Sequence, residues 1–364
     1  MKIGILTFHR ANNFGAALQC HALQTFLEQH GHNVYVIDFR CKAIEQVYYV
    51  LSPRLLFLRK NIIKAFIDYL FNLKNYTDMR VKRNEYEDFR KKYLHLVPFS
   101  KDINNDIDAF VAGSDQIWNL SLTNGSSETY FLEFPIKEKT LKISYAASSE
   151  VVSFREFKEN KDEISHALNG FDSISVREPE LKEELRKYTS KDIKVCVDPT
   201  FLLKKEYYER ILKVPQERNY VLVYHMAETE EAVKLANAIS QAKGLEVIEI
   251  HASFKSPCGI RHKKGLGPLQ ILGYIKYADT VITNSFHGTA LSLILQKNLW
   301  VINTYKSIRL FNLLVSVGLQ SRYISSLDEY NNNPINYDIV NENINKHIEK
   351  SEKFLEESLA NRKS

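Results

Sequence analysis

Short apolar runs alternate with longer amphipathic segments along most of this chain. Ile3 to Phe8 is apolar, and the residues after it place Ala16, Cys20, Leu23 and Leu27 on one helical face. Gly31 ends that pattern, and Val34 to Phe39 forms the next apolar run. The order strand, helix, strand predicts a parallel sheet, whose first loop lies at the carboxyl end of the strands, where α/β proteins bind ligands.

The same alternation continues in two successive blocks. The first block has apolar runs at 109–112, 141–147, 173–176 and 194–197, and the second has them at 220–224, 246–250, 280–283 and 299–303. A polar helical segment at 204–218 separates them. We therefore predict an α/β protein with two Rossmann-like domains and a cleft between them, over residues 1–203 and 204–335, followed by a C-terminal helix over 336–364.

Residues 46–97 interrupt the first block and differ from it in character. Between 48 and 74, apolar side chains alternate with basic ones, including Arg54, Arg59, Lys60 and Lys64. One interpretation is a helical insertion packed on the first sheet. The other is a basic amphipathic surface, over 46–74, that contacts an anionic membrane.

Composition limits the classes of function. The 364 residues are 44% hydrophobic and 26% charged with a net charge of +5, too weakly basic to predict a nucleic-acid partner. Four widely separated cysteines without CxxC spacing predict neither zinc nor disulfides, and no metal is expected. The strand-like N-terminus and the absence of any run of 18 apolar residues predict a cytoplasmic protein, with the inner face of the membrane as its alternative location.

The segment DTVITNSFHGTALSLIL, residues 279–295, carries the clearest chemical signal. Its apolar strand ends at Thr283, Asn284 or Ser285 can cap the following helix, and His287 lies at the positive end of that helix. A proton-donating histidine beside free helix-end N–H groups suits a phosphate or a carboxylate. The plain alternative is an ordinary strand, turn and helix with a solvated histidine.

Several motifs resemble, in order, those of polysaccharide pyruvyl transferases. They are NNFGAALQ, GSDQIWN, SYAAS, SVREPE, VDPTFLL, the string GPLQILGYIKYADTVITNSFHGTALSL, and SIRLFNLLVSVGLQSR, spread over about residues 1–325. The resemblance implies a GT-B-like pair of Rossmann-like domains. It also implies transfer of the pyruvyl group of phosphoenolpyruvate onto a sugar as a ketal, in capsule, exopolysaccharide or wall-polymer assembly.

The resemblance implies no cofactor besides phosphoenolpyruvate as co-substrate, and a glycan acceptor, which we expect to be lipid-linked or otherwise close to the membrane. Other branches of the family carry Arg-Leu-His-Gly where this chain has Ser285-Phe286-His287-Gly288. The helix-end histidine is present, but its neighbouring cation is missing, so another residue must balance the charges of the donor.

The donor side of the expected site centres on His287. Its pKa in a free peptide suits proton transfer near neutrality, so it is either the general acid or a phosphate ligand. Ser285 and the amides near Gly288 would hold phosphate oxygens.

Two arginines are candidates for clamping the anionic donor. Arg177 follows a strand directly, and Arg309 lies near a helix start with Lys306 just before it. A guanidinium binds a carboxylate or a phosphate through two hydrogen bonds. The alternative for Arg177 is a surface ion pair with Glu178 or Glu180.

The acceptor side is expected around two loops of the first block. Asp115 is the candidate base for the sugar hydroxyl, although a turn role after Gly-Ser is equally compatible with its position. Trp118 is either a platform for a sugar ring or a core residue. Asn12, Asn13 and Gly15 would shape the acceptor side of the cleft.

Two other functions fit part of the same pattern. A GT-B glycosyltransferase that uses a nucleotide sugar would also place a diphosphate at a helix N-terminus of the second domain. A non-catalytic polysaccharide-assembly protein would use 46–97 to dock on a membrane or a partner. Donor choice separates the two enzymes, and loss of activity on His287→Ala separates an enzyme from a scaffold.

Overall fold

The computed structural model describes residues 1–47, 70–71, 73–123, 128–151, 161–227, 229–251, 260–303 and 307–360. Most of the stretch 46–74, for which a membrane contact was expected, lies outside the described residues. Among the helices that are described, none is both long and apolar enough to cross a bilayer.

The first domain is built on a seven-stranded parallel sheet with the order β3-β2-β1-β4-β5-β6-β7. Its central strands are buried on both faces, as expected when helices cover a parallel sheet, and β4 is buried along its whole length. The strands are β1 (Lys2–Leu6), β2 (Asn33–Asp38), β3 (Leu96–Pro98), β4 (Ala109–Ala112), β5 (Leu141–Ala147), β6 (Ser173–Val176) and β7 (Ile193–Val195).

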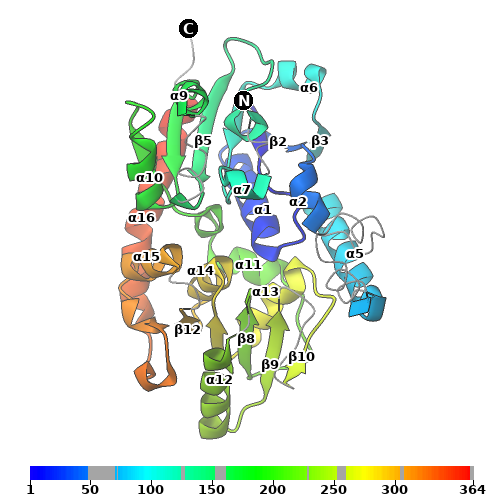
Figure 1. Cartoon of the computed structure of the whole chain (residues 1–364), viewed down its shortest axis with the longest axis vertical. Helices are drawn as coiled ribbons and strands as arrows, with labels where there is room; N and C mark the ends of the chain where they lie inside the picture. The colour runs from blue at the N-terminus through cyan, green and yellow to red at the C-terminus, as the bar shows by residue number, and fades with distance from the viewer. Residues whose placement is uncertain are drawn as a thin grey trace.

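The second domain has a six-stranded parallel sheet with the order β10-β9-β8-β11-β12-β13. Its strands are β8 (Val221–His225), β9 (Val247–His251), β10 (Arg261–His262), β11 (Thr280–Thr283), β12 (Asn298–Ile302) and β13 (Tyr323–Ile324). Together the two sheets form the pair of Rossmann-like domains in a GT-B-like arrangement, as predicted, with one domain above the other in Figure 1.

Helices flank both sheets and fill the space between them (Figure 1). Those of the first domain are α1 (Phe14–Gln29), α2 (Lys42–Val47), α5 (Tyr76–Tyr93), α6 (Lys101–Asp106), α7 (Leu120–Thr123), α9 (Lys161–Asn169) and α10 (Pro179–Leu185). Those that follow are α11 (Lys205–Ile211), α12 (Glu230–Lys243), α13 (Pro268–Tyr277), α14 (Phe286–Ile294), α15 (Ile308–Ser316) and α16 (Tyr337–Ala360).

Helix α1 lies at the junction of the domains. The apolar pattern predicted one buried face, but every residue from Phe14 to Leu27 is buried. The reason is that α1 contacts its own sheet on one side and α13 and α14 of the second domain on the other. Phe14 meets Tyr224 of β8 edge-on, with ring centroids 4.9 Å apart.

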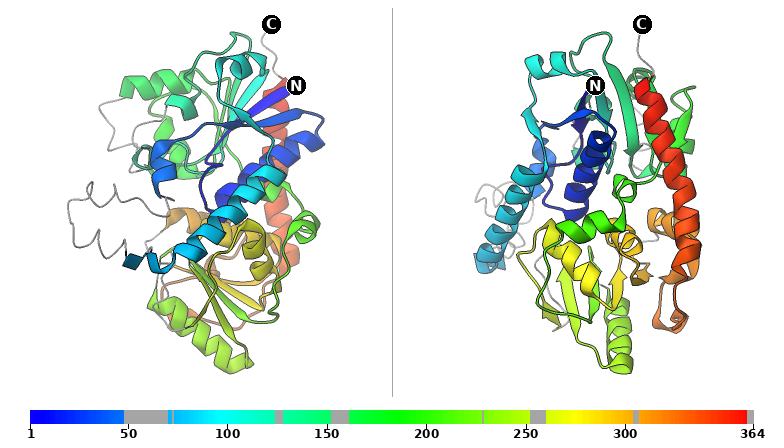
Figure 2. Two further views of the ribbon diagram at one scale, coloured as in Figure 1. Left: turned by 90° about the vertical axis from the view of Figure 1, so that its right-hand side faces the viewer. Right: turned by 180° about the vertical axis from the view of Figure 1, so that it is seen from behind.

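The C-terminal helix α16 runs back from the second domain along the first, as the rear view in Figure 2 shows. It contacts β5 and the turn at Pro199–Leu202. There the backbone N–H of Val197 donates to Ser351 Oγ at 3.0 Å. This crossing adds a second connection between the domains.

The described part of 46–97 is helical up to Tyr93, where α5 packs Tyr86, Phe89 and Arg90 against the first domain. The prediction that the helical insertion extends to residue 97 is wrong at its C-terminal end, because Leu96–Pro98 is strand β3 and pairs with β2. Pairing with an existing sheet edge lets three residues form a strand without a long apolar run.

Candidate functional site

His287 lies where the sequence placed it, in the first turn of α14, directly after β11 and its cap. Ser285 is the N-cap, and its Oγ accepts a hydrogen bond from Gly288 N at 3.2 Å. The Gly288 N–H is therefore used by the cap, which differs from the expected role in holding phosphate. Asn284 instead fixes the neighbouring loop, since its Oδ1 accepts from Met226 N and its Nδ2 donates to Ala227 O.

Gly15 makes the close approach of α1 to His287 feasible. A Cβ on Gly15 would lie 2.1 Å from Cγ and Nδ1 of the His287 ring, closer than any real contact. Asn13 caps α1 by accepting from the N–H groups of Gly15 and Ala16, which orients the start of the helix. The NNFG motif thus positions the histidine ring across the domain junction.

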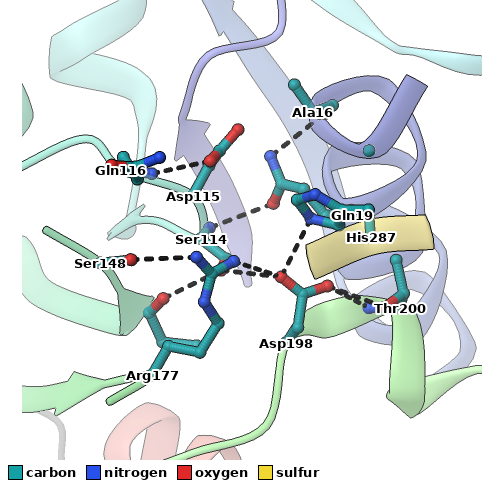
Figure 3. Close-up of polar contacts among 12 residues, drawn as sticks. Ala16, Gln19, Ser114, Asp115, Gln116, Ser148, Arg177, Asp198, Thr200 and His287 are labelled. Carbon is teal, nitrogen blue, oxygen red and sulfur yellow. Dashed lines mark hydrogen bonds and ion pairs between the residues drawn. The ribbon is translucent and has the colours of Figure 1, made fainter. Parts of the chain in front are cut away.

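Asp198 is the nearest carboxylate to this histidine (Figure 3), with its Oδ2 3.3 Å from His287 Nε2. The same oxygen accepts from Arg177 Nη1 at 2.9 Å, and Oδ1 accepts from the backbone N–H and the hydroxyl of Thr200. Burial alone would raise the pKa of this carboxyl, but His287, Arg177 and the Thr200 N–H outweigh it and hold the pKa well below its usual range. Asp198 is therefore a buried carboxylate anion directly beside the imidazole of His287.

Arg177 is almost fully buried, and the protein itself occupies its guanidinium. Besides Asp198, it donates from Nε to Glu178 Oε1 at 2.9 Å and from Nη2 to Ser148 Oγ at 3.0 Å. Phe286 covers it, with the guanidinium carbon 4.0 Å from the ring centroid. Burial opposes the charge, but Glu178 and Asp198 outweigh it and raise the pKa of Arg177. This buried network replaces the surface ion pair considered from sequence, and it makes Arg177 a support for Asp198.

Asp115 lies beside this network, in the loop after β4. Its backbone is left-handed, with φ of 72°, and its Oδ1 accepts from the N–H of Gln116 at 2.8 Å. Ser114, just before it, is buried: its hydroxyl donates to Ala146 O at 2.9 Å, and its backbone N–H donates to Gln19 Oε1 at 3.2 Å. Asp115 thus has the turn contact considered from sequence and also lines the cleft.

Arg309 approaches the site from the second domain, at the start of α15. Its Nη2 lies 3.5 Å from Glu150 Oε1, a loose pair compared with those of Arg177. Burial lowers the pKa of this guanidinium, and the nearby charge of Arg177 lowers it further. Lys306, its expected companion, lies outside the described residues.

Asp115, Arg177, His287 and Arg309 line one cleft of about 1050 Å³ between the domains, whereas Asp198 is buried and does not border it. Its walls hold more carboxylates than cations among the described residues: Asp115, Glu150, Glu178, Glu180, Glu183 and Glu184 against Arg177, Arg309, Lys187 and His287. Several acids lie on α10, and Asn312 of α15 bridges the domains by donating to Glu180 at 2.7 Å. In the described part of the chain, no group of three or more His, Cys, Asp or Glu side chains is arranged to hold a metal ion.

Three expected site residues are placed differently. Trp118 is fully buried, stacked on Phe131 and donating to Tyr130 O, so its indole packs in the core and does not face the cleft. Asn12 Oδ1 accepts from Arg90 Nη2 at 3.0 Å and borders a different cavity. Asn13 does reach the cleft, but its side-chain oxygen is used in capping α1.

Asp198 was not among the site residues expected from the sequence, and its contact with His287 was not predicted. The Asp-Pro-Thr order accounts fully for the turn and carries no signal for that contact. Ser148, which accepts a hydrogen bond from Arg177, was likewise not predicted, whereas Glu178 was considered as a partner of Arg177 but at the surface.

Comparisons with known proteins give one strong match. A family model described as polysaccharide pyruvyl transferase matches residues 13–307. A search of curated proteins found no match to the chain.

Solved structures match only distantly. UDP-GlcNAc 2-epimerase from Neisseria meningitidis bound to UDP-GlcNAc is 10% identical, with a TM-score of 0.46, covering 100% of this chain and 95% of that one. E. coli heptosyltransferase WaaC with ADP-2-deoxy-2-fluoro heptose is 11% identical, with a TM-score of 0.37, covering 84% and 89%. Likeness at this level says nothing about what the present chain binds.

Proposed function

The chain belongs to the polysaccharide pyruvyl transferase family, and on that premise we propose that it transfers the pyruvyl group of phosphoenolpyruvate onto a sugar of a polysaccharide or lipid-linked glycan intermediate. The product is a cyclic ketal, and phosphate is released. The observation that carries the proposal is the contact of His287, which lines the cleft between the domains, with the buried carboxylate of Asp198, which Arg177 also contacts.

The reaction needs an acid at the donor. Protonation of the methylene carbon of phosphoenolpyruvate gives a methyl group and a cationic C2, which one sugar hydroxyl attacks. The C2–O bond to phosphate then breaks, and a second hydroxyl of the sugar closes the ketal. Of the two hydroxyl protons lost, one replaces the proton given to carbon and the other leaves with phosphate or solvent.

His287 supplies the proton or contacts the phosphate in this scheme. The ionised Asp198, 3.3 Å from Nε2, stabilises the protonated ring and fixes its orientation. Arg177 is a positioning residue, since its hydrogen bonds hold Asp198 rather than a ligand. Arg309, with its looser pairing, is the cation of this cleft best placed to meet the donor's negative charge.

The acceptor sugar would lie toward Asp115 and the acids of α10. Carboxylates accept hydrogen bonds from sugar hydroxyls, and Asp115 is our candidate for the base that receives a hydroxyl proton. An acidic wall disfavours acceptors that carry a carboxylate at the modified residue. We therefore propose an uncharged sugar at the position where the ketal forms.

The test is phosphate release from phosphoenolpyruvate by purified full-length protein with membrane-extracted glycan acceptors, alongside UDP-, GDP- and CMP-sugars as competing donors. We expect release with phosphoenolpyruvate, a new methyl signal of the ketal by NMR, and a loss of at least about 10²-fold in His287→Ala. His95→Ala is the matched control, because His95 is exposed and pairs with Glu28 away from the cleft. Nucleotide release from a nucleotide sugar would instead identify a glycosyltransferase, and unchanged turnover in His287→Ala would remove the histidine from the chemistry.

A further inference from the structure

Gln19 is a buried polar residue of α1 that the proposed reaction does not use. It has no exposed surface, and it is the last residue of the NNFGAALQ motif. Gly15 lies four residues before it, so the two residues share one face of the helix, one turn apart. Because Gly15 contacts the His287 ring, the face that carries Gln19 is directed toward the site.

The side chain of Gln19 holds both backbone groups of Ser114, one directly and one through Thr7 (Figure 3). Its Oε1 accepts from the Ser114 N–H at 3.2 Å. Its Nε2 donates to Thr7 Oγ1 at 2.8 Å, and the Thr7 hydroxyl donates in turn to the Ser114 carbonyl at 2.9 Å. A further hydrogen bond from Nε2 to Ala16 O at 3.1 Å fixes the carboxamide on its own helix.

These hydrogen bonds allow one orientation of the carboxamide. The Thr7 hydroxyl gives its proton to Ser114 O, so its oxygen accepts from Gln19 Nε2, and Gln19 Oε1 is left to face the Ser114 N–H. All three residues are buried, where an amide without partners is costly. The two backbone groups of Ser114 therefore account for a glutamine at a position where apolar packing alone would not require one.

Ser114 connects this contact to both halves of the site. Asp115, the candidate base, is the next residue and borders the cleft. The Ser114 hydroxyl, which donates to Ala146 O, lies 3.4 Å from Asp198 Oδ2, the oxygen that faces His287. A shift of the Ser114 peptide therefore moves Asp115 relative to His287.

We propose that Gln19 is a positioning residue, which holds the Ser114 peptide so that Asp115 keeps a fixed place in the cleft relative to His287. One face of α1 then sets both sides of the site, His287 through Gly15 and Asp115 through Gln19. Gln19 itself has no exposed surface and contacts no substrate. That Asp115 receives a hydroxyl proton rests on the proposed function, whereas the hold on the loop does not.

Helix α1 supplies a matched control in Gln24. This glutamine is also buried and also holds a backbone segment, since its Nε2 donates to Tyr93 O at 3.2 Å and its Oε1 accepts from His95 N at 2.9 Å. It lies nine residues after Gly15, about 13 Å farther along the helix. Gln19→Met and Gln24→Met each replace a buried glutamine by an apolar side chain of similar length and good helix propensity. A merely structural role predicts the same consequences for both.

Hydrogen exchange, followed by mass spectrometry on the full-length protein, tests the hold on the loop without turnover. In Gln19→Met we expect exchange about tenfold faster in the segment 110–118, because the Ser114 N–H loses its acceptor, and no change at 93–97. Gln24→Met should show the reverse. Unchanged exchange at 110–118 in Gln19→Met would overturn the proposal.

The phosphate-release assay tests the effect on the chemistry. We expect Gln19→Met to lower kcat on the order of 10²-fold with the KM for phosphoenolpyruvate unchanged, as for a group misplaced by about 1 Å, and Gln24→Met to keep the wild-type kcat. In an Asp115→Asn background, Gln19→Met should cause no further loss, because it acts through Asp115. Losses that multiply in the double variant would refute the positioning role. If the wild type releases no phosphate, the proposed function fails, and hydrogen exchange still decides whether Gln19 holds the loop.

Gln19→Glu gives a rescue with a pH signature. Burial raises the pKa of a carboxyl at this position, toward about 8. The ionised carboxylate cannot donate to Thr7 or Ala16, whereas the protonated form both donates and accepts, as the amide does. Turnover divided by that of the wild type, which removes the titration of Asp115 and His287, should therefore rise as the pH falls from about 8 to about 6. A constant ratio, with both proteins folded by circular dichroism, would contradict the assigned hydrogen bonds.

Discussion

The contact between Gly15 and His287 gives a sharp test of how the site is held. In a helix such as α1, replacing glycine by alanine ordinarily stabilises the protein by about 0.5–1 kcal/mol. Here the new Cβ would lie 2.1 Å from two ring atoms of His287 and 2.5 Å from its Cβ. Carbon atoms pack best at about 3.5–4.0 Å, so the side chain or the domains must move by an ångström or more.

We therefore expect Gly15→Ala to destabilise the protein, which is opposite to the usual effect of this substitution in a helix. Overpacking of this kind costs about 1–3 kcal/mol in the free energy of unfolding. The movement also displaces His287 from Asp198, and a misplacement of about 1 Å lowers turnover on the order of 10²-fold. Both effects have one cause, the contact across the domain junction.

A double-mutant cycle isolates that cause. His287→Gly removes both the ring and the Cβ, whereas His287→Ala would keep a Cβ 2.5 Å from the new methyl group. In the glycine background, Gly15→Ala should be neutral or stabilising, which gives a coupling of about 1–3 kcal/mol. Urea unfolding followed by far-UV circular dichroism and by tryptophan fluorescence measures it, provided the m-values agree. If Gly15→Ala is as destabilising with glycine at 287 as with histidine, the ring contact is not the cause.

Four further predictions follow from the contacts described above. Asp198→Asn removes one of the two carboxylates that pair with the buried Arg177, the other being Glu178, and should lower the free energy of unfolding by about 3–5 kcal/mol and reduce turnover. The exposed Asp192→Asn should do neither, and equal effects would contradict the reasoning. Burial lowers the pKa of His21 to about 4 in the folded protein. As the pH falls from 6.5 to 4, the unfolded chain therefore binds one more proton than the folded chain, and the free energy of unfolding should drop by about 1.4 kcal/mol per pH unit. Urea midpoints measured against pH should fall less steeply in His21→Gln. Trp118→Phe should lower stability by about 1–3 kcal/mol without changing the apparent KM for acceptor, since the indole is buried; a raised KM would place it in the site. Arg309→Met should raise the KM for phosphoenolpyruvate about tenfold in the phosphate-release assay, and an unchanged KM would exclude a donor contact.

Local signals predicted the framework of the site. The cap of α14 depends on residues within three positions of each other, so the sequence was sufficient to narrow it to Asn284 or Ser285, and it is Ser285. The central strands were likewise readable, because a buried parallel strand is a continuous apolar run. The edge strands β10 and β13, each of two residues, were not, since pairing with a neighbour rather than apolar content defines them.

The sequence could not predict which residues far apart along the chain lie close together in the fold. Asp198 lies in the first domain and His287 in the second. The turn at Asp198 already accounts for an aspartate at that position, so the sequence carries no sign of the contact. Arg177 had the residue type and strand-end position of an anion clamp. Only the fold reveals that Ser148 reaches this guanidinium and that its pairing with Glu178 is buried.

The distribution of charge in the cleft makes Arg309 important for the donor. The resemblance described in the sequence analysis implies a cation where this chain has Ser285, and Ser285 is committed to capping α14. Arg177 does not replace it, because its guanidinium is already bound to Asp198 and Glu178. In the described part of the cleft, Arg309 and His287 then face a substrate with at least two negative charges, against a wall of carboxylates. For this reason we expect the loss of the guanidinium in Arg309→Met to weaken phosphoenolpyruvate binding, which a raised KM in the phosphate-release assay would report.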